Sequence, residues 1–217
     1  MGLPSGNRWA VSNLDVNSPY YFQESPFQYE CSFFSWGNVT PHNPVNETEF
    51  DYDFGGINSA PPYYEGQPYG ETPGSLLTGD IPLTHDAARK TLGNPWFIPA
   101  TNDFRELLNN CIYINENGTE VDTTKADKRV IVNGILGIYI ESKVNGARLF
   151  FSCSGYGNGR SWINRGTIGY YWSSTFLSDR YAQSLRFLSG GVNPQNNFNR
   201  YVGFALRPIW NPRKLHG

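Results

Sequence analysis

Residues 169–208 read GYYWSSTFLSDRYAQSLRFLSGGVNPQNNFNRYVGFALRP, and both ends of this stretch have the composition of buried strands. Tyr170, Tyr171 and Trp172 open it, and Phe204 and Leu206 stand near its end. Between these ends, aromatic, aliphatic and arginine residues mix with polar ones in no regular period. A constant frame around such a mixture is typical of a binding face. An ordinary strand–loop–strand segment with a few exposed apolar residues is the alternative interpretation.

The composition narrows the class of protein. The chain has 217 residues, enough for one large or two small domains. Hydrophobic residues make up 39%, charged residues 17% and aromatic residues 16%, which indicates a loop-rich globular protein whose core depends on rings. A net charge of -2 without a basic cluster argues against a nucleic-acid partner. No uninterrupted apolar run is long enough for membrane insertion.

The cysteines and the N-terminal residues indicate whether disulfides or a signal peptide are to be expected. Cys31, Cys111 and Cys153 are an odd set without metal-ligand spacing, so buried or free thiols are expected, with one disulfide as the alternative. The N-terminal residues show no basic segment followed by an apolar one, and we therefore expect no signal peptide in this sequence.

Two consecutive helices are predicted in the first half of the chain. Thr84 is expected to cap the first, which ends before Gly93, and Thr101 to cap the second, whose apolar face contains Phe104 and Leu107. Residues 37–79 lack any periodicity but carry many rings, so we expect a long irregular insertion loop laid across the domain. A disordered linker is the alternative.

Short strands are predicted for most of the second half. Asn145-Gly146 is a strong hairpin signal, and Asn133-Gly134 is either a second hairpin turn or a bulge. Residues 154–169 are interpreted as a loop, followed by strands over 170–174, 183–188 and 203–209. The sequence therefore predicts the α+β class, with two helices packed on short antiparallel strands and much irregular loop, in a single domain over residues 1–217.

Several motifs together resemble a known family. They are GLPSGNRWAVSNL at 2–14, FFSWGN at 33–38, HDAARKTLGNPWFIPATNDFRELLNNC at 85–111, GYYWSST at 169–175 and GFALRPI at 203–209. This order resembles the bacterial major paralogous domain family, and the similarity covers nearly the whole chain, with residues 37–79 its weakest part. The resemblance implies a C-type lectin-like fold, related to that of formylglycine-generating enzymes.

Within that family, residues 169–208 are similar to the variable region of proteins diversified by diversity-generating retroelements. These systems overwrite the end of a gene with adenine-directed errors, mostly in Asn codons that end in a pyrimidine. The constant positions of such regions are matched here by Tyr171-Trp172-Ser173-Ser174, Ala182, Leu185, Phe187, Ser189, Asn193, Asn199-Arg200, Gly203-Phe204 and Arg207-Pro208.

The resemblance assigns the variable, ligand-binding positions to Phe176, Leu177, Arg180, Ser184, Arg186, Leu188, Phe198 and Val202, and less firmly to the neighbouring Tyr181, Gln183 and Tyr201. All of these except Gln183 can arise from an Asn codon by changing adenines alone. The apolar members would supply contact area, Arg180 and Arg186 directional hydrogen bonds, and Tyr181 or Tyr201 a rigid rim. If they lie on the surface, single replacements by Ala should change stability little.

Signs of catalysis are missing from the sequence. Formylglycine-generating relatives use cysteines near the end of the chain, whereas the last cysteine here is Cys153. The histidines His42, His85 and His216 are scattered, and neither a catalytic triad nor a zinc pattern is visible. We therefore expect a protein that is not an enzyme and needs no metal or cofactor.

The expected function is binding of an unknown protein or glycan on a cell surface through a hypervariable C-terminal surface. The expected location is a virion or a cell surface. The alternative is a non-diversified bacterial surface adhesion or carbohydrate-binding module of the same family.

Overall fold

The computed structural model describes residues 1–55, 79–178 and 180–216. The chain is mostly β, with 36% strand and 11% helix. The expectation of an α+β class is therefore wrong, although the two predicted helices are present as α1 (Ala87–Leu92) and α2 (Thr101–Asn109). Strand prevails because segments rich in Gly, Asn and aromatic residues, such as 156–163 and 191–199, pair into strands.

The largest sheet is built around the C-terminal segment. It has the strand order β12-β11-β10-β13-β2, and its members are β2 (Phe33–Phe34), β10 (Gly169–Phe176), β11 (Tyr181–Leu188), β12 (Gly191–Asn199) and β13 (Phe204–Ala205). Neighbouring strands are antiparallel except for the parallel pair β10–β13. The predicted strands at 170–174 and 183–188 are thus confirmed, whereas β12 was not predicted. Asn and Pro are rare in strands, and β12 accommodates them because it lies at the edge of the sheet.

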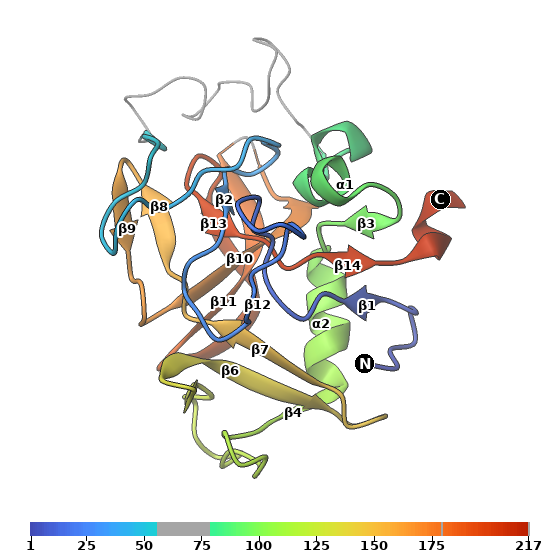
Figure 1. The fold of residues 1–217 in the computed structure, drawn as a ribbon. Coiled ribbons are helices and arrows are strands. Elements are labelled where there is room, and N and C mark those ends of the chain that lie inside the picture. Colours follow the sequence, from blue (N-terminus) through green and yellow to red (C-terminus); the bar gives the residue numbers. More distant parts are fainter. Residues whose placement is uncertain (56–78, 179, 217) are drawn as a thin grey trace.

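A second sheet joins the two ends of the chain. Its order is β1-β14-β3, formed by β1 (Arg8–Trp9), β3 (Trp96–Phe97) and β14 (Ile209–Trp210). Figure 1 shows these strands side by side next to both termini. Its central strand, β14, comes last in the sequence.

The remaining strands lie between Cys111 and Ile163 and pair with one another. A four-stranded sheet contains β4 (Cys111–Tyr113), β5 (Val130–Val132), β6 (Ile135–Ser142) and β7 (Arg148–Ser152), and a separate pair is formed by β8 (Tyr156–Asn158) and β9 (Ser161–Ile163). Asn133-Gly134 joins β5 to β6 with positive φ angles of 50° and 79°, as a two-residue hairpin turn requires. The hairpin predicted at Asn145-Gly146 is confirmed by the β6–β7 pairing. The loop predicted over 154–169 is partly wrong, because it contains β8 and β9.

The helix caps differ from the prediction. Asp86, not Thr84, caps α1 by accepting a hydrogen bond from the backbone N–H of Arg89, and a 3₁₀ turn (Leu83–His85) precedes it. Ala100 is the residue before α2, and its N–H donates to the carboxylate of Asp103. Thr101 is the first residue of α2 rather than its cap. A second 3₁₀ turn (Pro212–His216) follows β14.

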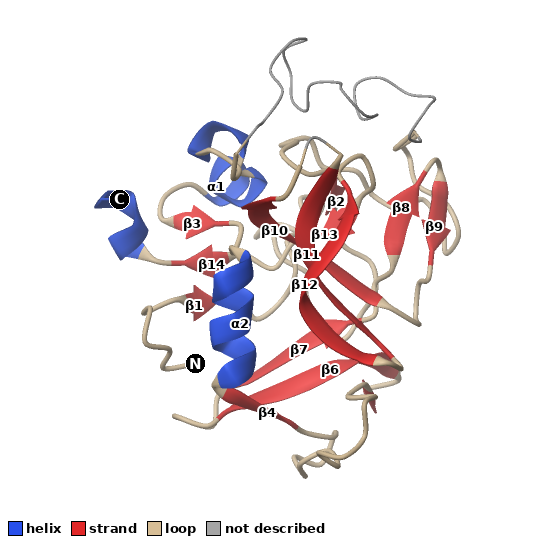
Figure 2. Ribbon diagram, turned by 180° about the vertical axis from the view of Figure 1, so that it is seen from behind, coloured by secondary structure: helices blue, strands red, loops and turns tan. Residues whose placement is uncertain are grey.

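The core consists of two apolar clusters on opposite faces of the large sheet. Tyr171, Leu185 and Phe187 face the cluster that contains Phe104 and Leu107 of α2. The opposite cluster consists mainly of Trp36, Trp172, Ala182 and Phe204 with their aromatic and aliphatic neighbours. Figure 2 shows α2 standing between the β1–β14–β3 sheet and the long strands β11 and β12. One face of these strands is therefore covered by α2.

Arg207 connects the ends of the chain inside the core, where its side chain is fully buried. Its guanidinium donates to Asn13 Oδ1 (2.9 Å) and to the carbonyl oxygens of Phe150 (2.7 Å), Val11 (3.2 Å) and Ala10 (3.4 Å). Burial lowers the pKa of Arg207 to about 10, so the group stays charged at neutral pH. It thereby ties the N-terminal segment to β7.

Part of the predicted insertion loop, residues 56–78, lies outside the described residues. The described part, residues 37–55, lies outside the named strands and contains isolated bridges from Pro44 to Phe50 and from Glu49 to Ser161. Phe50 and Phe54 are fully buried in it, and the ring of Phe54 packs against Gly157 and Gly203, which exchange a pair of backbone hydrogen bonds. The part of this predicted loop that is not described also contains aromatic residues, namely Tyr63, Tyr64 and Tyr69.

Candidate ligand-binding surface

The alternation of side chains in β10, β11 and β12 divides the C-terminal segment between two faces. Directly paired residues project to the same face of a sheet. Phe176 pairs with Ala182, and Ala182 pairs with Phe198. In the same way, Arg186 lies between Tyr170 on β10 and Asn193 on β12.

This register brings five predicted positions to the face opposite α2. We call this surface the Arg186 face, and its members are Phe176, Ser184, Arg186, Leu188 and Phe198, together with Asn193 and Asn196. They come from a stretch of more than twenty residues, and only the pleat of three strands places them together. The sequence alone did not show this arrangement.

A second group of predicted residues lies where β10 and β11 are connected. Leu177 is 41% exposed, and the guanidinium of Arg180 stands over the ring of Tyr181, 5.3 Å from its centroid. Arg180 Nε also donates to Asn199 Oδ1 at 3.4 Å. These side chains border the Arg186 face at the end where Phe176 is located.

Four predicted residues have buried side chains and do not face solvent. Ser184 and Val202 are 0% and 1% exposed, and the less firmly assigned Gln183 and Tyr201 are also buried. Ser184 Oγ donates to the carbonyl oxygen of Asn196 (3.2 Å) and accepts from its Nδ2 (3.1 Å). Val202 belongs to the cluster around Trp172. Their burial corrects the expectation of a fully exposed set.

Phe198 is half-buried, and it is packed more closely than a surface residue would be. Its ring lies 5.1 Å from that of Tyr156, 5.2 Å from Phe204 and 5.5 Å from Tyr170. Phe176 is similarly half-buried, 6.2 Å from the ring of Trp36. These two residues both contribute to the core and border the surface.

Two residues of this surface were missed by the sequence reasoning. Tyr156 supports Phe198 from β8, but its position in a Gly-rich stretch gave no signal. Asn193 was interpreted as a constant position, and it forms a turn in which its Oδ1 accepts the N–H of Gln195 (2.9 Å). That turn lies in a bulge of β12 that contains Pro194.

Arg186 is the charged group at the centre of this face. Its side chain is half-buried, and Nε is shielded from solvent without a hydrogen-bond partner. Burial raises the pKa of Tyr170, and the positive charge of Arg186 partly opposes that rise. Arg186, Leu188, Gly190, Gly191, Val192 and Asn193 line a hollow of about 160 Å³.

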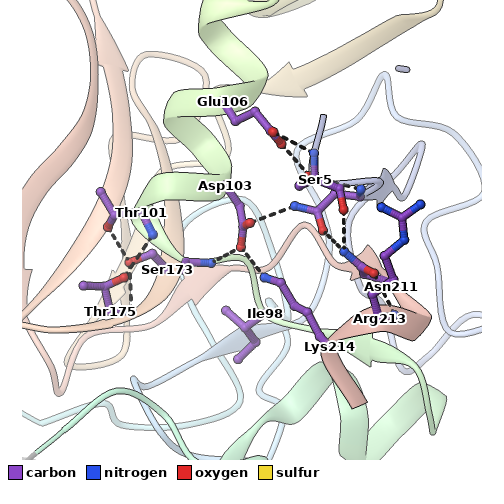
Figure 3. A network of polar contacts seen from close by, with 12 residues as sticks. Ser5, Ile98, Thr101, Asp103, Glu106, Ser173, Thr175, Asn211, Arg213 and Lys214 are labelled. Carbon is purple, nitrogen blue, oxygen red and sulfur yellow. Dashed lines mark hydrogen bonds and ion pairs between the residues drawn. The ribbon is translucent and has the colours of Figure 1, made fainter. Parts of the chain in front are cut away.

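A different polar cluster, at the N-terminal half of α2, is structural (Figure 3). The carboxylate of Asp103 accepts from Asn7 Nδ2 (2.7 Å), the N–H of Ala100 (2.8 Å) and Lys214 Nζ (2.7 Å). Glu106 accepts two hydrogen bonds from Ser5. Because these carboxylates are occupied by donors of the same chain, the cluster fixes both chain ends to α2.

No protein-family model, curated protein or solved structure matches the chain. The resemblance to retroelement-diversified proteins therefore stays a prediction.

Among the described residues, no group of His, Cys, Asp and Glu is arranged to hold a metal ion. The three cysteines are free and buried, which confirms the expectation of thiols. Burial raises the pKa of Cys111 to about 11 and that of Cys153 to about 12. The ring of His42 stacks on Tyr52 at 3.6 Å, and burial lowers its pKa to about 4. None of the described helices is both long and apolar enough to cross a bilayer.

Proposed function

We infer that this chain is a ligand-binding protein whose C-terminal surface is hypervariable and diversified by a retroelement. The contact surface consists of the members of the Arg186 face that reach solvent, Phe176, Arg186, Leu188, Asn193 and Phe198, and the adjoining residues Leu177, Arg180 and Tyr181. The partner is a protein or glycan on a cell, and the chain is displayed on a phage particle or a bacterial surface.

One observation carries this proposal: five of the eight predicted variable positions share one face of β10–β12. An unrelated set of residues would be divided between the two faces of a pleated sheet. Several matched constant positions, Tyr171, Trp172, Leu185, Phe187 and Arg207, are almost completely buried, whereas six of the eight variable positions, all except Ser184 and Val202, are half-buried or exposed. A buried frame can preserve the fold while side chains at the surface change.

The buried positions Ser184 and Val202 limit what variation can do. A larger side chain at either position would overpack the interior, which typically costs about 1–3 kcal/mol. Siblings of this protein are therefore expected to carry small residues at 184 and 202 and a wider range of residues at 177, 186 and 188.

The genomic test is direct. The DNA beside the gene should contain a near-copy of the segment that encodes residues 169–208, differing at adenines, and a reverse transcriptase gene. If the flanking DNA contains neither, diversification by a retroelement is refuted, whereas binding through the Arg186 face would still have to be tested by mutation.

A second candidate function is a non-diversified carbohydrate-binding module. It is favoured by an apolar hollow of about 400 Å³ outside the C-terminal segment, lined by Trp9, Phe22 and Trp96 among others. Aromatic faces and a few polar groups are common in small-ligand pockets. Loss of binding to a glycan array on Trp96→Ala, with no loss on Arg186→Met, would favour this function over the first.

A further inference from the structure

Residues 180–217 have a net positive charge, opposite in sign to that of the whole chain. Residues 180–217 contain no Asp or Glu, and their basic residues are Arg180, Arg186, Arg200, Arg207, Arg213 and Lys214, whereas the whole chain has a net charge of -2. A surface formed by β11 and β12 therefore has no acidic group from its own strands with which to neutralise Arg186.

Arg186 differs in this respect from other arginines of the protein. Arg129, Arg148 and Arg165 form ion pairs with Asp127, Glu141 and Glu30 at 2.6–2.7 Å. Within the described residues, no hydrogen bond or ion pair reaches the guanidinium of Arg186. Nε is the one shielded donor of this guanidinium, so its two Nη groups are the donors that an external acceptor can reach.

The shape of the site indicates the size of the group that would bind. The hollow beside Arg186 has about 160 Å³, below the roughly 300–1,000 Å³ of sites for small molecules. It accommodates a single protruding side chain. Asn193, paired with Arg186 on the neighbouring strand, uses its amide oxygen for Gln195, so its NH₂ group is left to donate.

The surroundings of the hollow favour a peptide over an isolated anion. Leu188 and Val192 line it, and Phe198 with Tyr156 forms an aromatic border on the same face. These apolar groups favour a partner in which the acidic residue has an apolar neighbour in the sequence. The edge of β12 does not suit added strand pairing, because Pro194 and the bulge interrupt its row of N–H groups. The contact is therefore made by side chains.

We propose that Arg186, with Asn193 beside it, binds a carboxylate side chain of an acidic peptide segment on the partner protein. This proposal rests on the proposed function, because it names the chemistry that the same surface recognises. The planar guanidinium donates two parallel hydrogen bonds to the two carboxylate oxygens, a geometry that Lys cannot reproduce.

The test uses the full chain and a random linear peptide library displayed on phage. Peptides enriched on the native protein are synthesised in two forms, with Asp and Glu or with Asn and Gln in their place. We expect the enriched peptides to be rich in acidic residues, and their amide forms to bind roughly tenfold more weakly or worse, as for the loss of a charge-assisted pair. Arg186→Met should bind both forms equally, and Arg186→Lys should recover only part of the difference.

Arg8→Met is the matched control, because Arg8 is exposed and belongs to β1 in the other sheet. It should discriminate between the two peptide forms as the native chain does. The melting temperature of each variant shows whether it is folded, and Arg186→Lys keeps the charge should Arg186→Met fail to fold.

The outcomes separate the two proposals. If peptides bind and lose binding on Leu188→Ala, but their amide forms bind equally well, the carboxylate proposal is overturned and the binding face remains. If the bound peptides ignore every change on the Arg186 face, both the carboxylate proposal and the assignment of this face as the peptide-contact surface are overturned. If no peptide is enriched, a peptide carboxylate is not what Arg186 binds.

Discussion

Replacing Arg207 by Met should strongly destabilise the protein, even though the residue is far from the candidate binding surface. Its two shortest hydrogen bonds, to Phe150 O at 2.7 Å and Asn13 Oδ1 at 2.9 Å, come from a charged group. Hydrogen bonds of this kind contribute about 1.5–3 kcal/mol each, so their loss should cost about 3–6 kcal/mol. The bonds to Ala10 and Val11 are longer and are left out of this value.

The magnitude is large compared with the stability of a typical domain, about 5–15 kcal/mol. Urea unfolding followed by tryptophan fluorescence would measure it, with the slope of the transition checked for two-state behaviour. Arg207→Lys should lie between the native protein and Arg207→Met, because an ammonium has three donors and no planar fork. Arg213→Met, at an exposed position, should change stability by no more than about 0.5 kcal/mol.

A result for Arg207→Met within about 1 kcal/mol of the native protein would refute this reasoning. It would mean that the desolvation cost of burying the guanidinium charge, which Met does not have, equals the stabilisation from the hydrogen bonds. Such compensation occurs when buried ionic groups are replaced by apolar ones.

Three further predictions concern stability. Burial raises the pKa of Asp86 from 3.8 to about 6 although two backbone N–H groups donate to it, so the stability contributed by the protonated carboxyl group is fully present below about pH 3.8 and is lost as pH rises through 6. Relative to Asp86→Asn, the native chain should therefore lose up to about 3 kcal/mol between pH 4 and pH 7 in urea unfolding, and a constant difference would contradict this. Gly157→Ala would place a Cβ 2.3 Å from the ring of Phe54 and should cost about 1–3 kcal/mol; Phe54→Leu in the same chain should recover part of that loss, and strict additivity would show that the two sites do not clash. Phe198→Ala should lower the free energy of unfolding by about 2 kcal/mol, because its half-buried ring contacts three others. As a control, Leu177→Ala should change it by no more than about 0.5 kcal/mol. Equal melting temperatures for the two variants would place Phe198 at the surface.

The parts of the fold that sequence predicted well depend on local chemistry. Asn133-Gly134 can adopt the two positive φ angles of a hairpin turn, and Phe104 and Leu107 recur at the spacing of one helix face. Such signals act between near neighbours in the chain. β12 was missed because its stability comes from pairing with β11 and not from its own residues.

The candidate site was only partly predictable for the same reason. The positions came from a resemblance in sequence, which does not say which way each side chain points. Ser184 is hidden because Asn196 covers it with two hydrogen bonds, and Val202 is hidden because it turns toward the cluster around Trp172. Arg186 and Asn193 are neighbours because the β11–β12 hairpin pairs them, and the bulge beyond that pair brings Asn196 opposite Ser184.

The late position of β13 and β14 in the sequence has a consequence for synthesis on the ribosome. β14 lies between β1 and β3, so these two early strands have no strand partner until residues 209–210 have been synthesised, and β13 later adds to β2, which already bridges to His42. Contacts between such distant residues form late and slowly. A copy that is cut short or shifted in reading frame before residue 204 would keep those strands unpaired and exposed to proteases. The pairing of these sheets is therefore completed only after segment 169–208 and the residues of β14 have been synthesised.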